Sequence, residues 1–338
     1  MRTPLLFTAS VAVLLAGAPG QSAAETVAQT APRAARQAIP HRVVGTGTPA
    51  SCTSAAFVAA VAKGGRITFD CGDKPVTIKV KRTAKVVNTN KRLVIDGGGK
   101  VTLDGAGKRR ILYQNTCDAK QTWTTSHCQD QRYPVLVLKR VRFAHGNSTG
   151  NKVEGGGGGA VFVRGGQLSI VDSVFRANRC DKHGPDLGGA AVRVLDMWRD
   201  RAVTVAGSTF KGGRCSNGGA LSSIGVSWDI KTSTFTGNRA VGHGANPKRS
   251  GTRGGGSGGA IYLDGNRFTL KLRKVTIEDN RANEGGGAIF FVSNDRTGTM
   301  RIVRSTLQRN QSKRFETAGL PGIFFLGRKH TVVDSVLK

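Results

Sequence analysis

A tandem repeat of about 30 residues runs from Gly159 to the end of the chain, and it restricts the fold to a solenoid. Each repeat holds three elements: a pair of small residues before an apolar run, an apolar-x-apolar element, and a Ser-x-apolar element often followed by Asn. The small pairs are Gly159-Ala160, Ala190-Ala191, Gly219-Ala220, Gly259-Ala260, Gly287-Ala288 and, in degraded form, Pro321-Gly322. The spacing between the second and third elements never varies, so the repeats describe one recurring unit.

The residue chemistry of the repeat favours strands over helices. The apolar runs are short, rich in β-branched or aromatic residues, alternate with period two, and are separated by Gly, Ser, Asn and Asp. We therefore predict an all-β, single-stranded right-handed parallel β-helix with three strands per coil. Equivalent side chains should then stack about 4.8 Å apart from coil to coil. The predicted interior column is Phe143, Phe175, Phe210, Phe235, Ile277, Leu307 and Leu337.

The first residues carry the pattern of a secretory signal peptide. Arg2 precedes an apolar run over residues 5–16, and small residues lead to a predicted cleavage after Ala24. That run is too short for a membrane span, and we predict no transmembrane segment elsewhere. We expect a secreted protein that is extracellular or associated with the cell surface.

The remaining chain divides into a linker and one domain. Residues 25–50 are rich in Ala, Thr, Pro and Arg without an apolar period, which predicts a disordered linker. Residues 51–338 form the predicted β-helix domain. Its first element is a helix over residues 53–63, which covers the open N-terminal end of the solenoid as a cap. No similar cap is visible at the C-terminal coil, which makes self-association through that coil an expected interaction.

Six cysteines in an exported chain predict disulfide bonds. Cys180 and Cys215 each lie five residues after a stacked Phe, so they occupy equivalent places on successive coils, within disulfide reach. We pair the others locally, as Cys52 with Cys71 and Cys117 with Cys128. A zinc site is the competing interpretation, but the chain has no Cys-x-x-Cys, and we predict no metal site.

Large side chains fall on the outward positions of the first strand of each repeat. If the neighbouring residues point inward, the outward column consists of Phe162, Arg193, Ser222, Tyr262, Phe290 and Phe324. Aromatic rings that face solvent would form a platform for sugar rings. Two alternatives stay open: long loops could fold over these rings, or the strand could be inside out.

Basic residues form further columns. Arg179, Arg214, Arg239 and Arg281 are predicted on successive coils. A third basic face, on the second strand and its turn, contains Lys231, Lys271, Arg273, Lys274, Arg301 and Arg304. The formal net charge is +30 and the pI is about 10.9. This charge indicates a polyanionic partner: an acidic polysaccharide, a cell-wall polyanion, an anionic lipid surface or, non-specifically, nucleic acid.

Several segments together resemble secreted bacterial right-handed parallel β-helix proteins of the pectate-lyase-like superfamily. They are GGRITFDCG, RLVIDGGGKVTLDG, RRILYQN and the GGAV or GGAI strands followed by SxFxxN. The GGAI and FxxN units also resemble the repeats of polymorphic outer membrane proteins. The resemblance implies the fold, and it implies polysaccharide binding along the first-strand sheet. It leaves the activity open, because the superfamily includes lyases, hydrolases, esterases, tailspikes and adhesins.

The chemistry in the chain favours binding over hydrolysis. Of the motifs carried by polygalacturonases of this fold, the sequence has only Gly242-His243-Gly244. A lyase needs a cation beside the uronate carboxylate and a base for the α-proton. Arg193 could take the place of the cation, with Tyr262 or His243 as the base. We expect no cofactor, and calcium could serve as one only under this alternative. We expect a protein that binds an acidic polysaccharide, with β-elimination of a uronate polymer as the alternative.

Overall fold

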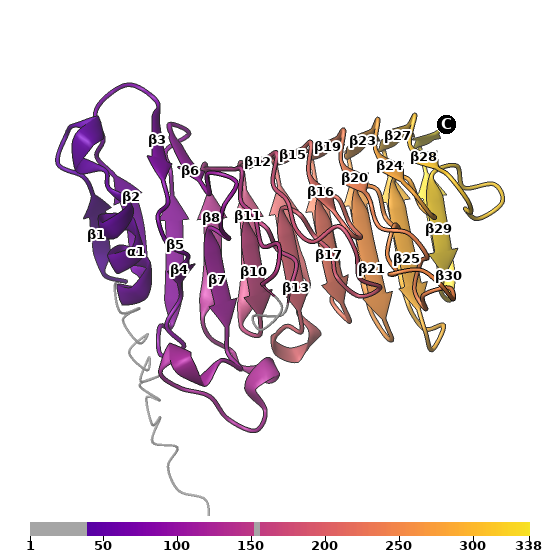
Figure 1. The fold of residues 1–338 in the computed structure, drawn as a ribbon, viewed down its shortest axis with the longest axis horizontal. Helices are drawn as coiled ribbons and strands as arrows, with labels where there is room; N and C mark the ends of the chain where they lie inside the picture. Colours follow the sequence, from indigo (N-terminus) through magenta and orange to yellow (C-terminus); the bar gives the residue numbers. More distant parts are fainter. Residues whose placement is uncertain (1–38, 152–155) are drawn as a thin grey trace, which may run out of the picture. The chain divides into compact units, whose positions relative to one another are not determined.

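The computed structural model describes residues 39–151 and 156–338. The predicted signal peptide and most of the predicted linker lie outside the described residues. From residue 39 onward, the strands stack side by side along one axis, with successive coils of the chain adjacent to one another (Figure 1).

Each element of the repeat builds one sheet. Sheet I, from the first elements, contains β4 (Ala84–Lys85), β7 (Leu112–Asn115), β10 (Val161–Arg164), β13 (Val192–Leu195), β17 (Leu221–Ile224), β21 (Ile261–Gly265), β25 (Ile289–Ser293) and β29 (Ile323–Leu326). Sheet II, from the second elements, contains β1 (His41–Val44), β2 (Gly65–Phe69), β5 (Arg92–Asp96), β8 (Val135–Lys139), β11 (Gln167–Val171), β14 (Val203–Ala206), β18 (Trp228–Lys231), β22 (Thr269–Arg273), β26 (Thr299–Val303) and β30 (Lys329–Val333).

Sheet III, from the third elements, contains β3 (Val76–Lys79), β6 (Val101–Asp104), β9 (Arg142–Ala144), β12 (Val174–Arg176), β15 (Thr209–Lys211), β19 (Thr234–Thr236), β23 (Thr276–Glu278), β27 (Thr306–Gln308) and β31 (Val336–Leu337). A short sheet IV adds β16 (Arg214–Cys215), β20 (Arg239–Ala240), β24 (Arg281–Ala282) and β28 (Gln311–Ser312). The paired strands are parallel in all four sheets. The predicted parallel β-helix is confirmed, with a fourth strand added to several coils.

The interior column has the predicted register. Phe143, Phe175, Phe210 and Phe235 are direct partners on neighbouring strands. Their rings are stacked with successive centroid distances of 4.9, 4.9 and 4.7 Å. Ile277, Leu307 and Leu337 continue the column. The stack buries apolar area from coil to coil, and this burial stabilises the packing of each coil on the next.

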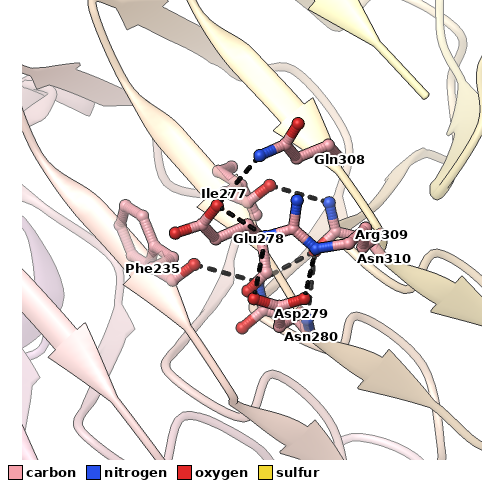
Figure 2. Close-up of polar contacts among 8 residues, drawn as sticks. All are labelled: Phe235, Ile277, Glu278, Asp279, Asn280, Gln308, Arg309 and Asn310. Atoms are coloured by element: carbon pink, nitrogen blue, oxygen red, sulfur yellow. Dashed lines mark hydrogen bonds and ion pairs between the residues drawn. The ribbon is translucent and has the colours of Figure 1, made fainter.

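Two kinds of polar ladder explain why Ser and Asn recur in the Ser-x-Phe-x-x-Asn unit of the repeat. The hydroxyl of Ser208 donates to Ala206 O at 2.9 Å and accepts the N–H of Ser173 at 3.1 Å. The amide of Asn280 donates to Phe235 O at 3.0 Å and to Asn310 Oδ1 at 2.9 Å, as Figure 2 shows. These bonds satisfy backbone groups that the bends between strands would otherwise leave unpaired.

The predicted N-terminal helix is confirmed as α1 (Ser54–Lys63). Its first turn is capped by the Thr53 hydroxyl, which accepts the N–H of Ala56 at 3.1 Å. Phe57 and Val61 are fully buried against the first coil, and Gly64 ends the helix with a φ of 65°.

The predicted boundary at residue 51 is wrong. Strand β1 lies inside the predicted linker and pairs in register with β2, and η1 (Pro49–Ser51) follows it. The run HRVV is only four residues long and follows a segment rich in Ala and Pro, and such a composition is typical of a linker. The strand was therefore not predicted.

All three predicted disulfide bonds are present. They join Cys52 to Cys71, Cys117 to Cys128 and Cys180 to Cys215, with Cα separations of 5.7, 4.9 and 4.7 Å. The last bond connects equivalent positions of adjacent coils, as the repeat register predicts.

Candidate functional site

The aromatic column on the outer side of sheet I is covered, so the expected solvent-facing platform is wrong. Phe162, Tyr262 and Phe290 are 1%, 0% and 3% exposed, and only Phe324 is partly accessible. The rings do not belong to the interior cluster of the β-helix. They stack on one another, as Tyr262 does on Phe290 at 5.0 Å, and Phe315 from a loop packs against Phe324 at 4.9 Å. Loops folded over the strands, one of the open alternatives, therefore account for these residues.

Arg193 is held by the loop that covers it. Its guanidinium donates from Nη1 to Ser222 Oγ at 2.9 Å and from Nη2 to the backbone oxygen of Asp186. The side chain is buried, and this burial lowers its pKa to about 10. The remaining donor, Nε, has no hydrogen-bond partner within the described parts of the chain. Arg193 is thus a structural anchor for this loop as well as one wall of a cavity.

Tyr262 belongs to a buried polar network. Its hydroxyl donates to Asp264 Oδ2 at 3.0 Å, and Asn246 Nδ2 reaches the same oxygen at 3.1 Å. Asn246 also donates to Asp186 Oδ1 at 2.6 Å. Burial, together with the nearby Asp264 carboxylate, raises the pKa of Tyr262 well above its ordinary value. The phenol is therefore protonated at neutral pH and is a poor proton acceptor.

A cavity of about 700 Å³ lies over sheet I, and Arg193, Asp186, Asn246 and Asp264 are among its lining residues. His243, the other candidate base, is exposed and lines a different groove, where it contacts Asn283 Nδ2 at 3.2 Å. The structure therefore does not bring Arg193, Tyr262 and His243 together. No group of three or more His, Cys, Asp or Glu side chains within residues 39–151 and 156–338 could hold a metal ion.

The predicted arginine column does form, on sheet IV and the position before it. The backbones of these arginines are neighbours on successive coils. Arg179 and Arg214 form a parallel β-bridge, and strand pairing places Arg214 beside Arg239 and Arg239 beside Arg281. The first three are exposed and Arg281 is half-buried. Among the described residues, no carboxylate forms an ion pair with any of these four. The spacing of parallel strands, about 4.8 Å, holds their backbones in a regular row.

The N-terminal end of this column opens into a groove of about 1120 Å³. Arg179 and Arg214 line it, and loops add basic side chains that the sequence alone did not assign to a site. These additions are Lys182, His183 and Arg253, beside the expected His243. Asp181 is the acidic residue among the lining side chains. The loops differ in length from coil to coil, so the repeat register carries no signal for their position.

One of these loops is held by a buried carboxylate. Glu284 is almost fully buried and accepts from Arg249 at 2.7 and 2.9 Å and from the N–H of Gly244 at 2.8 Å. Burial raises the pKa of the Glu284 carboxyl, but the bonds from Arg249 and Gly244 outweigh it and hold the pKa below its ordinary value. The charged pair thereby fixes the loop that carries His243 and Arg253 beside the groove.

The fold and this surface define a basic parallel β-helix protein with one long arginine row. Residues 232–264 and 274–292 match the family described as the Chlamydia polymorphic membrane protein repeat. These segments contain the FxxN and GGAI units, so the likeness lies in the repeat itself. No curated protein and no solved structure matches the chain. Within the described residues, no helix is long and apolar enough to cross a membrane.

Proposed function

We propose that this protein is an exported binding protein for an acidic polysaccharide or another polyanionic surface polymer, which it holds along the arginine column. The observation that carries the proposal is the row formed by Arg179, Arg214, Arg239 and Arg281, in register and without a carboxylate partner among the described residues. The three disulfide bonds support export, because such bonds persist in oxidising compartments.

Electrostatics favours an extended ligand over a small one. Two like charges about 5 Å apart in water repel by roughly 0.8 kcal/mol, and every neighbouring pair in the column adds such a term. A linear polymer with one acidic group per sugar would relieve this repulsion along the whole row. The net charge of +30 would also attract any polyanion from a distance and accelerate binding.

Beta-elimination, the alternative function, receives no support from this geometry. Arg193 lies beneath a loop, the raised pKa of Tyr262 keeps its phenol protonated, and His243 belongs to the other groove. In a lyase, the cation and the base must both contact the same sugar residue, and these three side chains do not surround one site.

The test is co-sedimentation of the purified protein with insoluble uronate polysaccharides, compared with uncharged ones. The Arg179→Gln/Arg214→Gln variant should lose roughly tenfold in affinity per arginine, since each hydrogen bond to a charged group contributes about 1.5 kcal/mol. A matched control is Lys271→Gln/Arg301→Gln, which removes two exposed and directly paired cations from sheet II.

Equal losses in the two variants would refute a role for the column and leave only non-specific attraction by the net charge. The same samples, with and without calcium, should show no rise in ultraviolet absorbance. An increase in absorbance from an unsaturated product would show that the protein is a lyase.

A further inference from the structure

A second basic surface lies at another corner of the β-helix, where sheet I strands lead into sheet II. Most connections at this corner are short, but residues 116–134 between β7 and β8 and residues 196–202 between β13 and β14 form longer loops. Both loops extend from the lower edge of the stack in Figure 1. The coil between them has only Gly165 and Gly166 at this position.

The two loops meet over that glycine pair. Trp198 N–H donates to Gly166 O at 3.0 Å, and Gly166 N–H donates to Gln131 O at 3.1 Å. Asp130 Oδ1 accepts the N–H of Arg199 at 2.7 Å. A Cβ at Gly166 would lie 2.3 Å from Pro134 O, so only glycine permits this contact. The disulfide bond between Cys117 and Cys128 closes the longer loop, which makes the corner a fixed surface.

Three guanidinium groups surround one indole at this corner. The guanidinium carbons of Arg132, Arg199 and Arg201 lie 5.4, 5.3 and 4.9 Å from the ring centre of Trp198. All three arginines are exposed, and none forms an ion pair with a carboxylate in the part of the chain that the structure describes. Stacking on the indole fixes the guanidinium groups and leaves their N–H groups for an external anion.

Exposed aromatic rings accompany these charges on the longer loop. Trp123 is 43% and Tyr133 37% exposed, both unusually accessible for large aromatic side chains. The backbone oxygen of Trp123 accepts a bond from Asn88 Nδ2 at 2.6 Å, so the ring sits on an anchored segment. Its neighbours Thr122 and Thr124 are uncharged. We name the set Trp123, Arg132, Tyr133, Trp198, Arg199 and Arg201 the aromatic–arginine corner.

We propose that the aromatic–arginine corner docks the protein onto an anionic phospholipid bilayer. Tryptophan and tyrosine favour the interface between lipid and water, and arginines near an anionic leaflet are attracted to its headgroups. None of the corner residues lines the groove beside Arg179 or the cavity over sheet I, and a bilayer, unlike a small soluble ligand, needs no concave site. The guanidinium groups over Trp198 also occupy the ring surface that a sugar or a base would use for stacking. This surface is separate from the arginine column.

The test is binding of the purified protein to vesicles of phosphatidylcholine, alone or mixed with phosphatidylglycerol. We expect co-sedimentation only with the anionic vesicles, and a blue shift of tryptophan fluorescence as Trp123 enters the interface. Trp228 is fully buried and serves as a constant background. Half-buried Trp198 lies in the same corner and also fluoresces, so Trp123→Ser should markedly reduce the blue shift. Arg199→Gln/Arg201→Gln should weaken vesicle binding roughly 30-fold.

The matched control is Arg179→Gln/Arg214→Gln, which removes the same charge from the arginine column. It should bind the vesicles as the unaltered protein does, while losing affinity for acidic polysaccharide. The proposal is overturned if both double variants lose vesicle binding equally, if the blue shift is undiminished in Trp123→Ser, or if the anionic vesicles do not bind. Capture of a protein partner that depends on Trp123 but not on lipid would also overturn it. Failure of polysaccharide binding alone would refute only the proposed function.

Discussion

At the scale of single residues, the Asn of the repeat has a role that its position alone did not reveal. Asn238, Asn280 and Asn310 form a ladder in which each amide donates to a backbone oxygen of the preceding coil. Asn238 and Asn280 also donate to the next Asn, and Figure 2 shows the step from Asn280 to Asn310. The bends that precede these asparagines have left-handed backbones, for example at Asp279 with a φ of 58°. The ladder therefore supplies the hydrogen bonds that such a bend cannot make itself.

Replacing Asn238 with Ala should lower the free energy of unfolding by about 3 kcal/mol, because it leaves buried groups unpaired. These groups are Phe210 O and Gly213 N–H, both bonded to the Asn238 side chain at 3.0 Å. Asn280 Oδ1 loses the bond from Asn238 Nδ2 at 2.9 Å but keeps the bond from the backbone N–H of residue 238. Urea denaturation measures the change. Asn310→Ala is the control at the half-buried end of the ladder and should cost less. Equal losses for the two variants would contradict the buried-ladder account.

Because of Glu284, the free energy of unfolding should decrease as the pH falls into the acid range. Its folded-state pKa lies below the ordinary value of 4.5, so the unfolded chain takes up the proton more readily. The stabilisation is therefore complete above about pH 5 and is lost as the pH falls through the folded-state pKa. Glu284→Gln should flatten the dependence of the urea midpoint on pH between about pH 5 and pH 3. The exposed Glu316→Gln is the control, and an unchanged profile in Glu284→Gln would show that another carboxyl is responsible.

Of the candidate site, the arginine column could be predicted from the sequence, whereas the burial of the aromatic column could not. The column of Arg179, Arg214, Arg239 and Arg281 follows from the repeat register alone, because register fixes which residues share a face. The exposure of Phe162, by contrast, depends on the loops that cover it, and loop conformation is not set by strand periodicity. The aromatic–arginine corner escaped prediction for the same reason.

At the scale of elements, the constant spacing between the second and third strands has a conformational cause. One residue in the left-handed region turns the chain from sheet II to sheet III, at Asp172, Gly207, Thr232, Lys274, Arg304 and Asp334, with φ between 47° and 59°. A single such residue permits no variation in length. The sequence thus predicted the strands and α1 well, but missed β1 and sheet IV, which are short and lie outside the periodic runs.

Thr232→Gly should stabilise the protein by about 1 kcal/mol, because a β-branched residue in a left-handed conformation is strained and glycine is not. Gly207 already occupies the equivalent bend of another coil with a φ of 59°. Thr234→Gly, two residues later within β19, is the matched control and should destabilise by about 1 kcal/mol. Thermal denaturation compares them. Destabilisation of similar size in both variants would show that the bend is not strained.

At the scale of the whole molecule, the question is whether the net charge or its arrangement binds a polymer. The chain has 51 Lys and Arg against 21 Asp and Glu, so attraction to any polyanion is expected from every side. This long-range term is screened within about 10 Å at ordinary salt, whereas charges in direct contact also displace counterions from the polymer. The two contributions therefore differ in how they respond to salt.

Salt titration of polysaccharide binding should separate them. If Arg179 and Arg214 contact the polymer, Arg179→Gln/Arg214→Gln should reduce the slope of log affinity against log salt concentration by roughly two, one for each lost contact. Lys271→Gln/Arg301→Gln lowers the net charge by the same amount on sheet II, and it should leave that slope nearly unchanged. Equal changes of slope would mean that the polymer samples the charged surface without a preferred face. A change confined to the column would show that the register of the β-helix, by aligning one arginine per coil, converts a high net charge into a linear binding site.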